Sequence, residues 1–266
     1  KIFFSSIDSL SLVIERKYKS IKNPILKTLY FIELQKCRMT ERKLFSVLKK
    51  SHFVSSIDSR FAINQLGLTE AVTIPNGINS KHYYYKEKQS KSFDVIFTGN
   101  FNYAPNIESA NFIIDELSPY ALQYFPKLHF ILAGANPTEK MRNCTQTNIK
   151  VTGKVESLTP YLQNSAIFVS PIFNGAGIKN KVLEAMACGL YCVCSPLSLD
   201  GIDYPIHYSL INGNNPEQWL KKIDDNIKKD NISKKDLEKF HQQYNWEKIT
   251  KRYSASYHSQ ASNNDS

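Results

Sequence analysis

The chain has 266 residues, 42% of them hydrophobic, which is long enough for two modest domains with their own cores. No uncharged apolar run approaches the roughly 18 residues that a membrane-spanning helix needs, so the sequence predicts a soluble globular protein. The formal net charge of +10 lies in the first third, where residues 1–92 hold seventeen Lys and Arg against seven Asp and Glu. Such a surface favours anionic partners, namely phospholipid headgroups, phosphorylated acceptors or nucleic acid, or it is a solvated helical face.

The first 80 residues alternate between short strands and helices, which predicts a basic first domain over 1–80. The expected elements are a strand at 2–4, helices over 8–21 and 24–50, a strand at 52–56, a helix from Ser56 or Asp58 to Leu66, and a strand at 71–75. In the second helix Ile25, Leu29 and Ile32 recur at helical spacing, a pattern typical of an apolar face. Lysines and arginines fill much of the remaining surface of this helix.

After a polar, aperiodic linker over 81–92, apolar strands alternate regularly with helices. Strands are expected at 93–99, 128–134, 149–153, 166–171 and 191–195, with helices over 105–117, 155–165, 180–188, 216–229 and 233–242. Unbroken apolar strands between helices predict an α/β fold with a doubly wound parallel sheet covered on both faces, here over 93–245. A last helix over 246–257 and a disordered tail over 258–266 complete the expected organisation.

Ligands of doubly wound sheets bind beyond the carboxyl ends of the strands, and the glycine loop "NGAGIKN" is the candidate there. Gly175 and Gly177 allow a ligand to approach the backbone, and the N–H groups of Ile178 to Lys181 are expected to be free at the start of the next helix. A helix start carries partial positive charge and spare donors, which suits a phosphate. Lys179 or Lys181 would add a full positive charge.

Glu184 follows one turn inside that helix and is expected to face the same ligand site at the helix start. A carboxylate would repel a phosphate, but it can accept two hydrogen bonds from a vicinal diol such as that of a ribose. A phosphate on the amides and a ribose on the acid together predict a nucleotide diphosphate. The alternative is that Glu184 compensates the helix dipole, which is worth a few tenths to about 1 kcal/mol.

Other motif-based sites are absent or weaker. No G-K-[ST] occurs, which excludes a P-loop, and "GAGIKN" lacks the third glycine of a dinucleotide fingerprint. The sequence "CGLYCVC" suggests a metal site, but its alternation is better explained by a core strand, and no Asp-x-Asp motif is present. An odd cysteine count without a secretory signal predicts reduced cytosolic thiols at Cys37, Cys144, Cys188, Cys192 and Cys194.

Four motifs fall in order along the chain: "FTGNFNYAPN", "VTGKV", "GIKNKVLEAMACG" and "YNWEKITKRY". This combination resembles retaining glycosyltransferases of the GT-B fold, glycosyltransferase family four ("group one"), over most of residues 52–257. The resemblance extends to "DSLSL" and "LYFIELQKCRMTERKLF", which are similar to the end of the N-terminal domain in a bacterial branch. It implies two Rossmann-like domains facing a cleft, with the nucleotide sugar on the second. The family's glycine-rich loop and catalytic-site histidine would precede Lys1, so the start of the first domain is expected to be missing.

Carried over residue by residue, Glu184 is similar to the family's ribose-binding acid. Gly177 to Asn180 correspond to the surroundings of the diphosphate, and Gly153 to Val155 to the wall of the nucleobase. The resemblance thus implies a donor site formed by Gly99, Asn100, Asn106, Gly153, Lys154, Val155, Leu158, Gly175, Gly177, Ile178, Lys179, Asn180, Lys181 and Glu184. Asp8 is expected near the cleft from the first domain and joins Glu184 as a candidate catalytic residue.

The chain departs from the family pattern at two places. The family's first acid, eight positions before Glu184, is replaced here by Ala176. The Arg and Lys that often hold the diphosphate from the first loop are replaced by Asn100, Asn102 and Tyr103, so Lys179 and Lys181 would have to supply the charge.

The resemblance implies a hexosyltransferase-like enzyme that transfers a sugar from a nucleotide diphosphate sugar to a glycan or lipid-linked acceptor with retention. We expect a role in bacterial polysaccharide biosynthesis, no metal cofactor, and a cytoplasmic location at the inner face of the membrane. The basic helix over 24–50 is a candidate for peripheral contact with anionic lipid. The alternatives are a catalytically silent nucleotide-sugar-binding or scaffold domain, a sugar-nucleotide epimerase, and a nucleic-acid binder. The last is disfavoured because most aromatics of the basic third occupy core-like positions.

Overall fold

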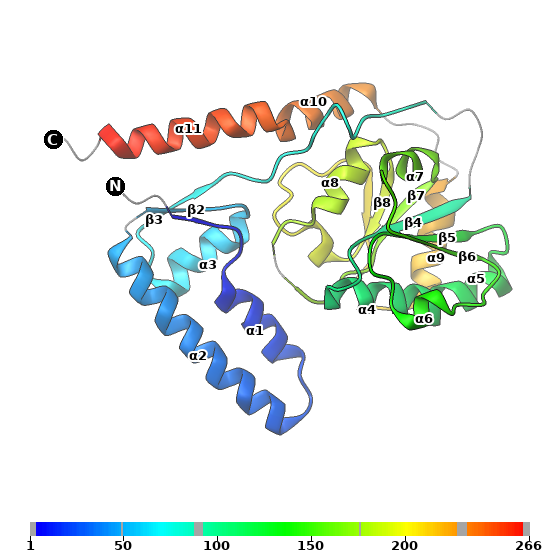
Figure 1. The fold of residues 1–266 in the computed structure, drawn as a ribbon, viewed down its shortest axis with the longest axis horizontal. Helices are drawn as coiled ribbons and strands as arrows, with labels where there is room; N and C mark the ends of the chain where they lie inside the picture. Colours follow the sequence, from blue (N-terminus) through cyan, green and yellow to red (C-terminus); the bar gives the residue numbers. More distant parts are fainter. Residues whose placement is uncertain (1–3, 49, 88–92, 176, 228–232, 263–266) are drawn as a thin grey trace.

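The computed structural model describes residues 4–48, 50–87, 93–175, 177–227 and 233–262, which form two lobes (Figure 1). The first lobe contains a three-stranded parallel sheet of order β1-β2-β3. Its elements are β1 (Phe4–Ser6), α1 (Leu10–Ser20), α2 (Pro24–Val47), β2 (Lys50–Phe53), α3 (Ser56–Leu66) and β3 (Glu70–Thr73). The elements follow the sequence prediction in kind and order, and the boundaries of the strands differ by one to three residues.

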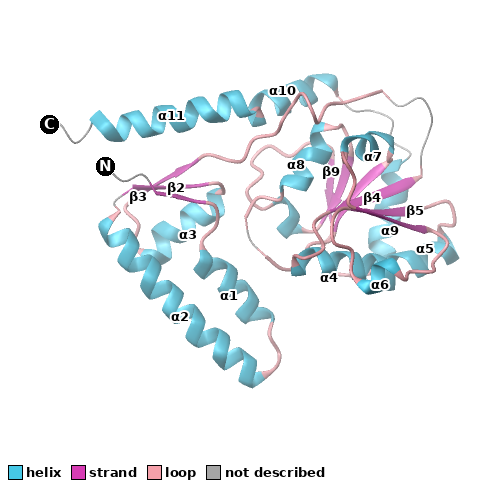
Figure 2. Ribbon diagram, in the orientation of Figure 1, coloured by secondary structure: helices cyan, strands magenta, loops and turns pink. Residues whose placement is uncertain are grey.

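The second lobe is built on a six-stranded parallel sheet of order β6-β5-β4-β7-β8-β9 (Figure 2). Its strands are β4 (Asp94–Thr98), β5 (His129–Ala133), β6 (Ile149–Gly153), β7 (Ile167–Ser170), β8 (Tyr191–Cys194) and β9 (Tyr208–Leu210). Counted within the lobe, this is the order 3-2-1-4-5-6 of doubly wound nucleotide-binding sheets, and the order reverses between β4 and β7. The predicted parallel α/β sheet is confirmed, and β9 is an added edge strand that its short, polar sequence did not indicate.

Helices cover both faces of this sheet. The helical elements are α4 (Ala104–Phe112), the π turn η1 (Ile113–Leu117), α5 (Ser118–Tyr124), α6 (Glu139–Arg142), α7 (Thr159–Asn164), α8 (Asn180–Ala187), the 3-10 turn η2 (Pro196–Leu199), α9 (Pro216–Ile227) and α10 (Lys234–Tyr244). One core joins β4 to α4, η1, α5 and α9 around Trp219, and the other joins it to α7, α8 and α10. The sequence predicted a helix end at residue 117. The chain instead stays helical to Tyr124, because the π turn accommodates Pro119, which has no amide to donate.

The apolar face expected on the first turns of α2 is not buried. Ile25 is 75% exposed and Leu29 58% exposed, and Ile32 is exposed as well. The buried contacts of α2 begin at Leu34 and end at Phe45, because its first turns extend beyond the sheet of the first lobe (Figure 1). The three residues have the helical spacing that the sequence shows, but they are exposed.

Two segments connect the lobes. The helix α11 (Trp246–Ser262) packs the Trp246 ring on Gly77 at its start, and Tyr253 lies 4.4 Å from the His52 ring of the first lobe, centroid to centroid. This helix continues to Ser262, five residues beyond the predicted end at 257, because no glycine or proline interrupts it. Its last residues thus belong to the segment that was expected to be a disordered tail, and residues 263–266 lie outside the described residues. No helix in the described part of the chain is long and apolar enough to cross a membrane.

The second connection is the chain between β3 and β4, which includes the predicted linker. Ile78 pairs with Asn245 in a parallel bridge, and its N–H donates to the Tyr244 carbonyl at 2.7 Å. Residues 82–84 then run along α7 of the second lobe, with Tyr83 half-buried against the α7–α8 core and His82 and Tyr84 exposed. The linker predicted over 81–92 thus makes contacts with the second lobe at its first residues, and residues 88–92 lie outside the described part.

Candidate functional site

A cavity of about 270 Å³ opens at the carboxyl end of β4, beside the point where the strand order reverses. Its walls come from the ends of three neighbouring strands and from α8. The lining residues are Thr98, Gly99, Asn100, Gly134, Ala135, Lys154, Val155, Leu158, Lys181 and Glu184. Seven of these were named from the sequence. Thr98, Gly134 and Ala135 were not, although the loop "AGANP" leaves β5 at the same edge of the sheet.

The floor of the cavity is formed by tightly packed backbone. Gly134 has a φ of +148°, and a Cβ atom built there would overlap the carbonyl oxygen of Gly99. Backbone bonds hold the loops together at this point, from the Gly99 N–H to Ala133 at 3.0 Å and from the Gly134 N–H to Gly153 at 3.2 Å. Gly153 thus supports the cavity from behind, and only glycine at 134 allows the first two loops to lie this close.

Lys181 and Glu184 lie three residues apart on α8, so they share one face of the helix, and both line the cavity. The Lys181 ammonium lies 4.5 Å from the centre of the Phe97 ring and donates a hydrogen bond to Oδ1 of Asn106. Burial and the neighbouring charge of Lys179 together lower the pKa of Lys181 to about 7, against the opposing charge of Glu184. Asn106 itself is buried under Gly99, where it holds Lys181 and does not line the cavity.

Glu184 is half-buried, and its pKa responds to Tyr83 and to Lys181. Tyr83 comes from the chain that connects the lobes, and its ring packs against the core of α7 and α8. Burial raises the pKa of Glu184, while Tyr83 and the charge of Lys181 oppose this rise. Burial and the carboxyl group of Glu184 raise the pKa of Tyr83. Sequence reasoning missed Tyr83, because it belongs to a segment without periodicity.

The glycine loop before α8 faces the first lobe and does not line the cavity. Lys179 is buried and donates to the Gly177 carbonyl at 2.6 Å; burial lowers its pKa to about 8, against the charges of Asp200 and Asp8. Gly177 has a φ of +72°, and a Cβ atom there would overlap the Asp8 carboxylate. Asp8 of the first lobe therefore reaches the loop before α8. Lys179 lies near the carboxylates of Asp8 and Asp200 and does not line the cavity.

Further contacts fix the loop between the lobes. Arg16 donates to the Gly175 carbonyl at 2.9 Å and forms an ion pair with Asp200 at 2.8 Å. Asn180 accepts a hydrogen bond at 3.0 Å from Asn76 of the connecting chain. Ile178 packs beside Gly201, on the side away from the cavity lining. Of the residues predicted around the diphosphate, only Lys181 thus lines the cavity; Ala176 lies outside the described residues.

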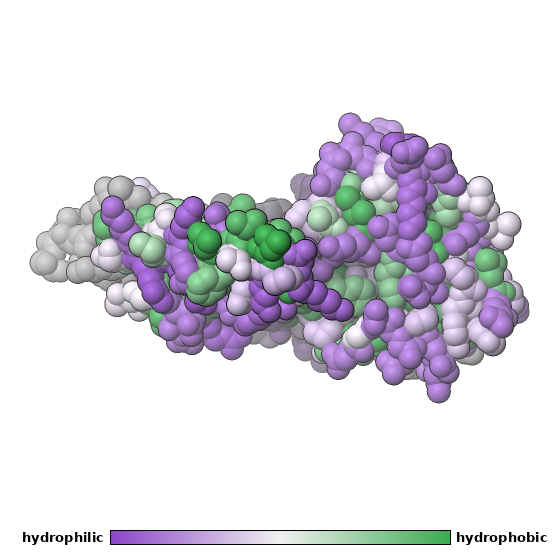
Figure 3. All heavy atoms as spheres, turned by 90° about the horizontal axis from the view of Figure 1, so that it is seen from below, coloured by the Kyte–Doolittle hydropathy of each residue, from purple (hydrophilic) through white to green (hydrophobic). Residues whose placement is uncertain are grey.

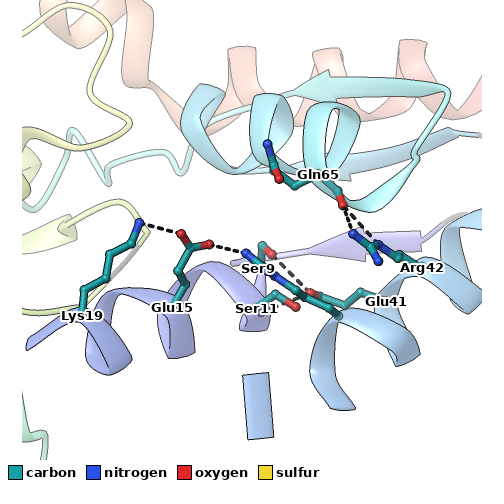
Figure 4. A network of polar contacts seen from close by, with 8 residues as sticks. Ser9, Ser11, Glu15, Lys19, Glu41, Arg42 and Gln65 are labelled. Carbon is teal, nitrogen blue, oxygen red and sulfur yellow. Dashed lines mark hydrogen bonds and ion pairs between the residues drawn. The ribbon is translucent and has the colours of Figure 1, made fainter. Parts of the chain in front are cut away.

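A polar network in the first lobe joins the start of α1 to Glu41 of α2 (Figure 4). The start of α1 has no capping side chain of its own, and the Glu41 carboxylate of α2 accepts from the N–H groups of Leu10 and Ser11 at 3.0 and 3.1 Å. Buried Asp58 accepts from the Ser9 N–H at 2.8 Å. These acids replace the missing cap and fix the turn that carries Asp8. Asp58 is therefore not the N-cap of α3, a role that Ser55 takes.

No group of three or more His, Cys, Asp and Glu side chains within the described ranges is arranged to hold a metal ion. Four of the five cysteines are buried and all are free thiols. Cys192 and Cys194 lie in β8, between β7 and the edge strand β9, where they pack in the core.

The strand order and the cavity at the switch point define a Rossmann-like α/β protein with a ligand site at the carboxyl edge of its second sheet. The family described as "Glycosyl transferases group 1" matches residues 92–229, which is more than half of the sequence. The chain belongs to this family. The matched residues include all ten that line the cavity, from Thr98 to Glu184.

The chain is 21% identical over 220 residues to an uncharacterized 44.6 kDa protein in the cps region of Klebsiella pneumoniae, covering 77% of this chain and 55% of that relative. Anabaena HepE in complex with UDP and glucose has a TM-score of 0.67 at 13% identity, covering 97% of this chain and 71% of that one. Sucrose-phosphate synthase from Thermosynechococcus elongatus has a TM-score of 0.67 at 15% identity, covering 93% and 65%. These structures confirm the predicted GT-B type of α/β fold. The chain spans about half the length of the curated relative.

Proposed function

We propose that the chain provides the donor half of a retaining glycosyltransferase of family four, which transfers a hexose-like sugar from a nucleotide diphosphate sugar. The observation that carries this proposal is the pairing of Lys181 and Glu184 on one face of α8, in the cavity at the switch point. A cation and a carboxylate at this spacing match a diphosphate next to a ribose diol. HepE, which shares the fold, was solved with UDP and glucose.

In this proposal the two charged groups have separate tasks. The Lys181 ammonium and the start of α8 hold the diphosphate, and they stabilise the negative charge that grows on it as the bond to the sugar breaks. Glu184 accepts hydrogen bonds from the ribose, while Lys154, Val155 and Leu158 form the wall for the base. The proposal assigns no metal to the site, because Lys181 and the helix start supply the positive charge.

Asp8 lies on the side where the two lobes meet, against the loop that leads into α8. We propose that it contacts the transferred sugar or the acceptor there. It would take the place of the family's first acid, whose position is occupied by Ala176 in this chain. The acceptor is proposed to be a glycan or a lipid-linked glycan of bacterial polysaccharide synthesis, at the cytoplasmic face of the membrane. The relative in a cps region supports this assignment.

The donor site is tested by calorimetric titration of the chain with UDP, GDP and ADP. We expect one nucleotide to bind, and Glu184→Gln to weaken its binding by about 10- to 150-fold, the loss of charge-assisted hydrogen bonds worth about 1.5–3 kcal/mol. Glu217→Gln, which removes an exposed acid on α9, is the matched control and should leave binding unchanged. Failure of all three nucleotides to bind would contradict the proposal.

Transfer itself is tested by incubating the protein with the sugar form of the nucleotide that binds. Release of nucleotide diphosphate, with an α-linked product from an α-linked donor, is expected for a retaining enzyme. Tight donor binding without transfer or hydrolysis would favour the second candidate, a catalytically silent nucleotide-sugar-binding domain. The observation that favours this candidate is Ala176, which occupies the position of the family's first acid.

We also propose that α2 makes peripheral contact with anionic membrane. Exposed Ile25, Leu29 and Ile32 lie among Lys22, Lys27 and Lys36 at the protruding end of the first lobe, and Figure 3 shows hydrophobic side chains gathered on this lobe. Apolar residues flanked by lysines suit a surface of anionic headgroups.

Co-sedimentation with phosphatidylglycerol vesicles should retain the protein, and phosphatidylcholine vesicles should not. Leu29→Asp should release it, whereas Val47→Asp, at a still more exposed site at the other end of α2, should not. Equal sedimentation with both lipids would refute membrane contact of this kind.

A further inference from the structure

A second cavity, of about 610 Å³, lies between residues 203–208, helix α10 and the start of α11. Its volume falls within the roughly 300–1,000 Å³ that is typical of sites for small organic ligands, and it is more than twice that of the donor cavity. Of the described residues, none lines both cavities. The proposed function assigns no role to this second cavity.

Two exposed tyrosines line the second cavity from the chain between β8 and β9. Tyr204 is 61% exposed and Tyr208 is 39% exposed. The Tyr204 N–H donates to the Tyr244 hydroxyl at 3.3 Å, and the Tyr208 carbonyl accepts from the Tyr191 hydroxyl at 2.8 Å. Rings that are presented to solvent from a fixed backbone lose little conformational entropy when a ligand stacks on them.

The backbone between these tyrosines has an uncommon conformation. His207 has a φ of +49°, in the left-handed region that residues other than glycine rarely adopt, and its carbonyl accepts from the Cys192 N–H of β8 at 2.7 Å. Ile206 and Tyr208, on either side of it, both line the cavity. Such conformations persist where the surrounding structure holds them, and they concentrate at ligand sites.

One face of α10 forms the opposite side of the cavity. Asp236, Lys239, Phe240 and Gln243 recur at intervals of three and four residues, so they share one side of the helix, and all four line the cavity. Phe240 is buried, whereas Asp236 and Lys239 are exposed. The cavity therefore combines apolar rings with polar groups that can donate and accept hydrogen bonds.

This combination matches a neutral glycan. A pyranose ring has a face of C–H groups that stacks on an aromatic ring, and its hydroxyls bond to carboxylates, amides and ammonium groups. The acids of the lining, Asp203 and Asp236, are balanced by Lys239 and Lys248. The donor cavity instead has two lysines and one acid, which suits a phosphate-bearing ligand. The second cavity has no such surplus of positive charge among its described lining residues.

We propose that the second cavity is a glycan-binding site, separate from the donor site, in which a neutral oligosaccharide stacks on Tyr204 and Tyr208 and bonds to the polar face of α10. The inference goes beyond the proposed function and does not depend on nucleotide binding. A glycan held at this place would stay on the protein while the donor site is empty.

The test uses four neutral oligosaccharides as probes, namely maltotetraose, cellotetraose, mannotetraose and chitotetraose. Saturation-transfer NMR should detect binding of at least one of them to the chain, and calorimetric titration then measures its affinity. Tyr204→Ala and Tyr208→Ala should each weaken this affinity by about fivefold or more, because each removes a stacking ring. Tyr204→Phe keeps the ring and should bind nearly as wild type does.

The matched control is Tyr124→Ala. Tyr124 is a tyrosine of α5 that is 55% exposed and does not line the cavity, so its removal should leave the affinity unchanged. Tyr204 and Tyr208 are exposed, and circular dichroism should show that both alanine variants keep the fold. An excess of UDP, GDP and ADP should leave oligosaccharide binding unchanged, because the nucleotides are proposed to bind in the other cavity.

The outcomes separate this inference from the proposed function. If none of the four probes binds, the inference is overturned. Binding that both alanine variants retain would also overturn it, as would displacement of the oligosaccharide by nucleotide, since the sugar would then lie in the donor cavity. Oligosaccharide binding that depends on Tyr204 and Tyr208, in a chain that binds no nucleotide, would support this inference while the proposed function fails.

Discussion

Lys181 is a half-buried lysine whose lowered pKa makes the free energy of unfolding depend on pH. Burial beside Phe97 lowers its pKa from 10.5 to about 7. Between these two values the unfolded chain holds a proton that the folded chain has released. Unfolding therefore takes up a proton, and the free energy of unfolding rises with pH across this window by about 1.4 kcal/mol per pH unit. Over the full window the difference is on the order of 5 kcal/mol.

Lys181→Met keeps the length of the side chain and removes its charge. We expect the variant to be more stable than wild type near pH 7, by about 1–3 kcal/mol after the hydrogen bond to Asn106 is lost. This advantage should shrink as the pH rises toward 9, because wild type gains stability there and the variant does not.

Urea denaturation followed by circular dichroism at pH 6.5, 7.5 and 8.5 measures the difference. Lys221→Met, which changes an exposed lysine on α9, is the control and should follow the wild-type pH profile. Parallel pH profiles of wild type and Lys181→Met would refute this account. A diphosphate bound next to Lys181 would restore its proton, so nucleotide affinity should fall with pH above about 7 in wild type only.

Three further predictions concern the framework of the site. Gly134→Ala should destabilise the protein by about 2 kcal/mol or more, since its Cβ would overlap the Gly99 carbonyl; an unchanged urea midpoint would show that the two loops can separate. Trp219→Ala should cost about 3–5 kcal/mol and lower the melting temperature, because the indole is fully buried in one of the two cores, and a loss below 1 kcal/mol would contradict that packing. Glu41→Ala should cost about 1 kcal/mol by uncapping α1, measured by thermal unfolding, with Glu33→Ala on the exposed side of α2 as the control; equal effects of the two would argue against the cap.

Local spacing in the sequence is sufficient to predict several features of the fold and the site. The run "GIKNKVLEAMACG" is apolar on two faces of a helix and places Lys181 and Glu184 three residues apart, so their common direction followed from helical geometry. The apolar strands between helices likewise required a parallel sheet with both faces covered, which in turn located the ligand at its carboxyl edge.

Only the tertiary structure decided which charges face the cavity and which face the other lobe. Lys179 and Lys181 are the same residue type and lie two positions apart. Lys179 nevertheless lies against Gly177 and the acidic groups between the lobes, whereas Lys181 lies over the Phe97 ring. Their directions depend on partners that are distant in sequence, which no local pattern encodes.

The same reason explains the remaining differences. Tyr83 belongs to a stretch that looks like a linker, yet its ring packs against core residues of α7 and α8 that lie far along the chain. Ile25 and Leu29 have the spacing of a core face, but spacing fixes only which residues share a side of a helix. Whether that side meets a sheet or solvent depends on where the helix extends past its neighbours, and this is a property of the assembled fold.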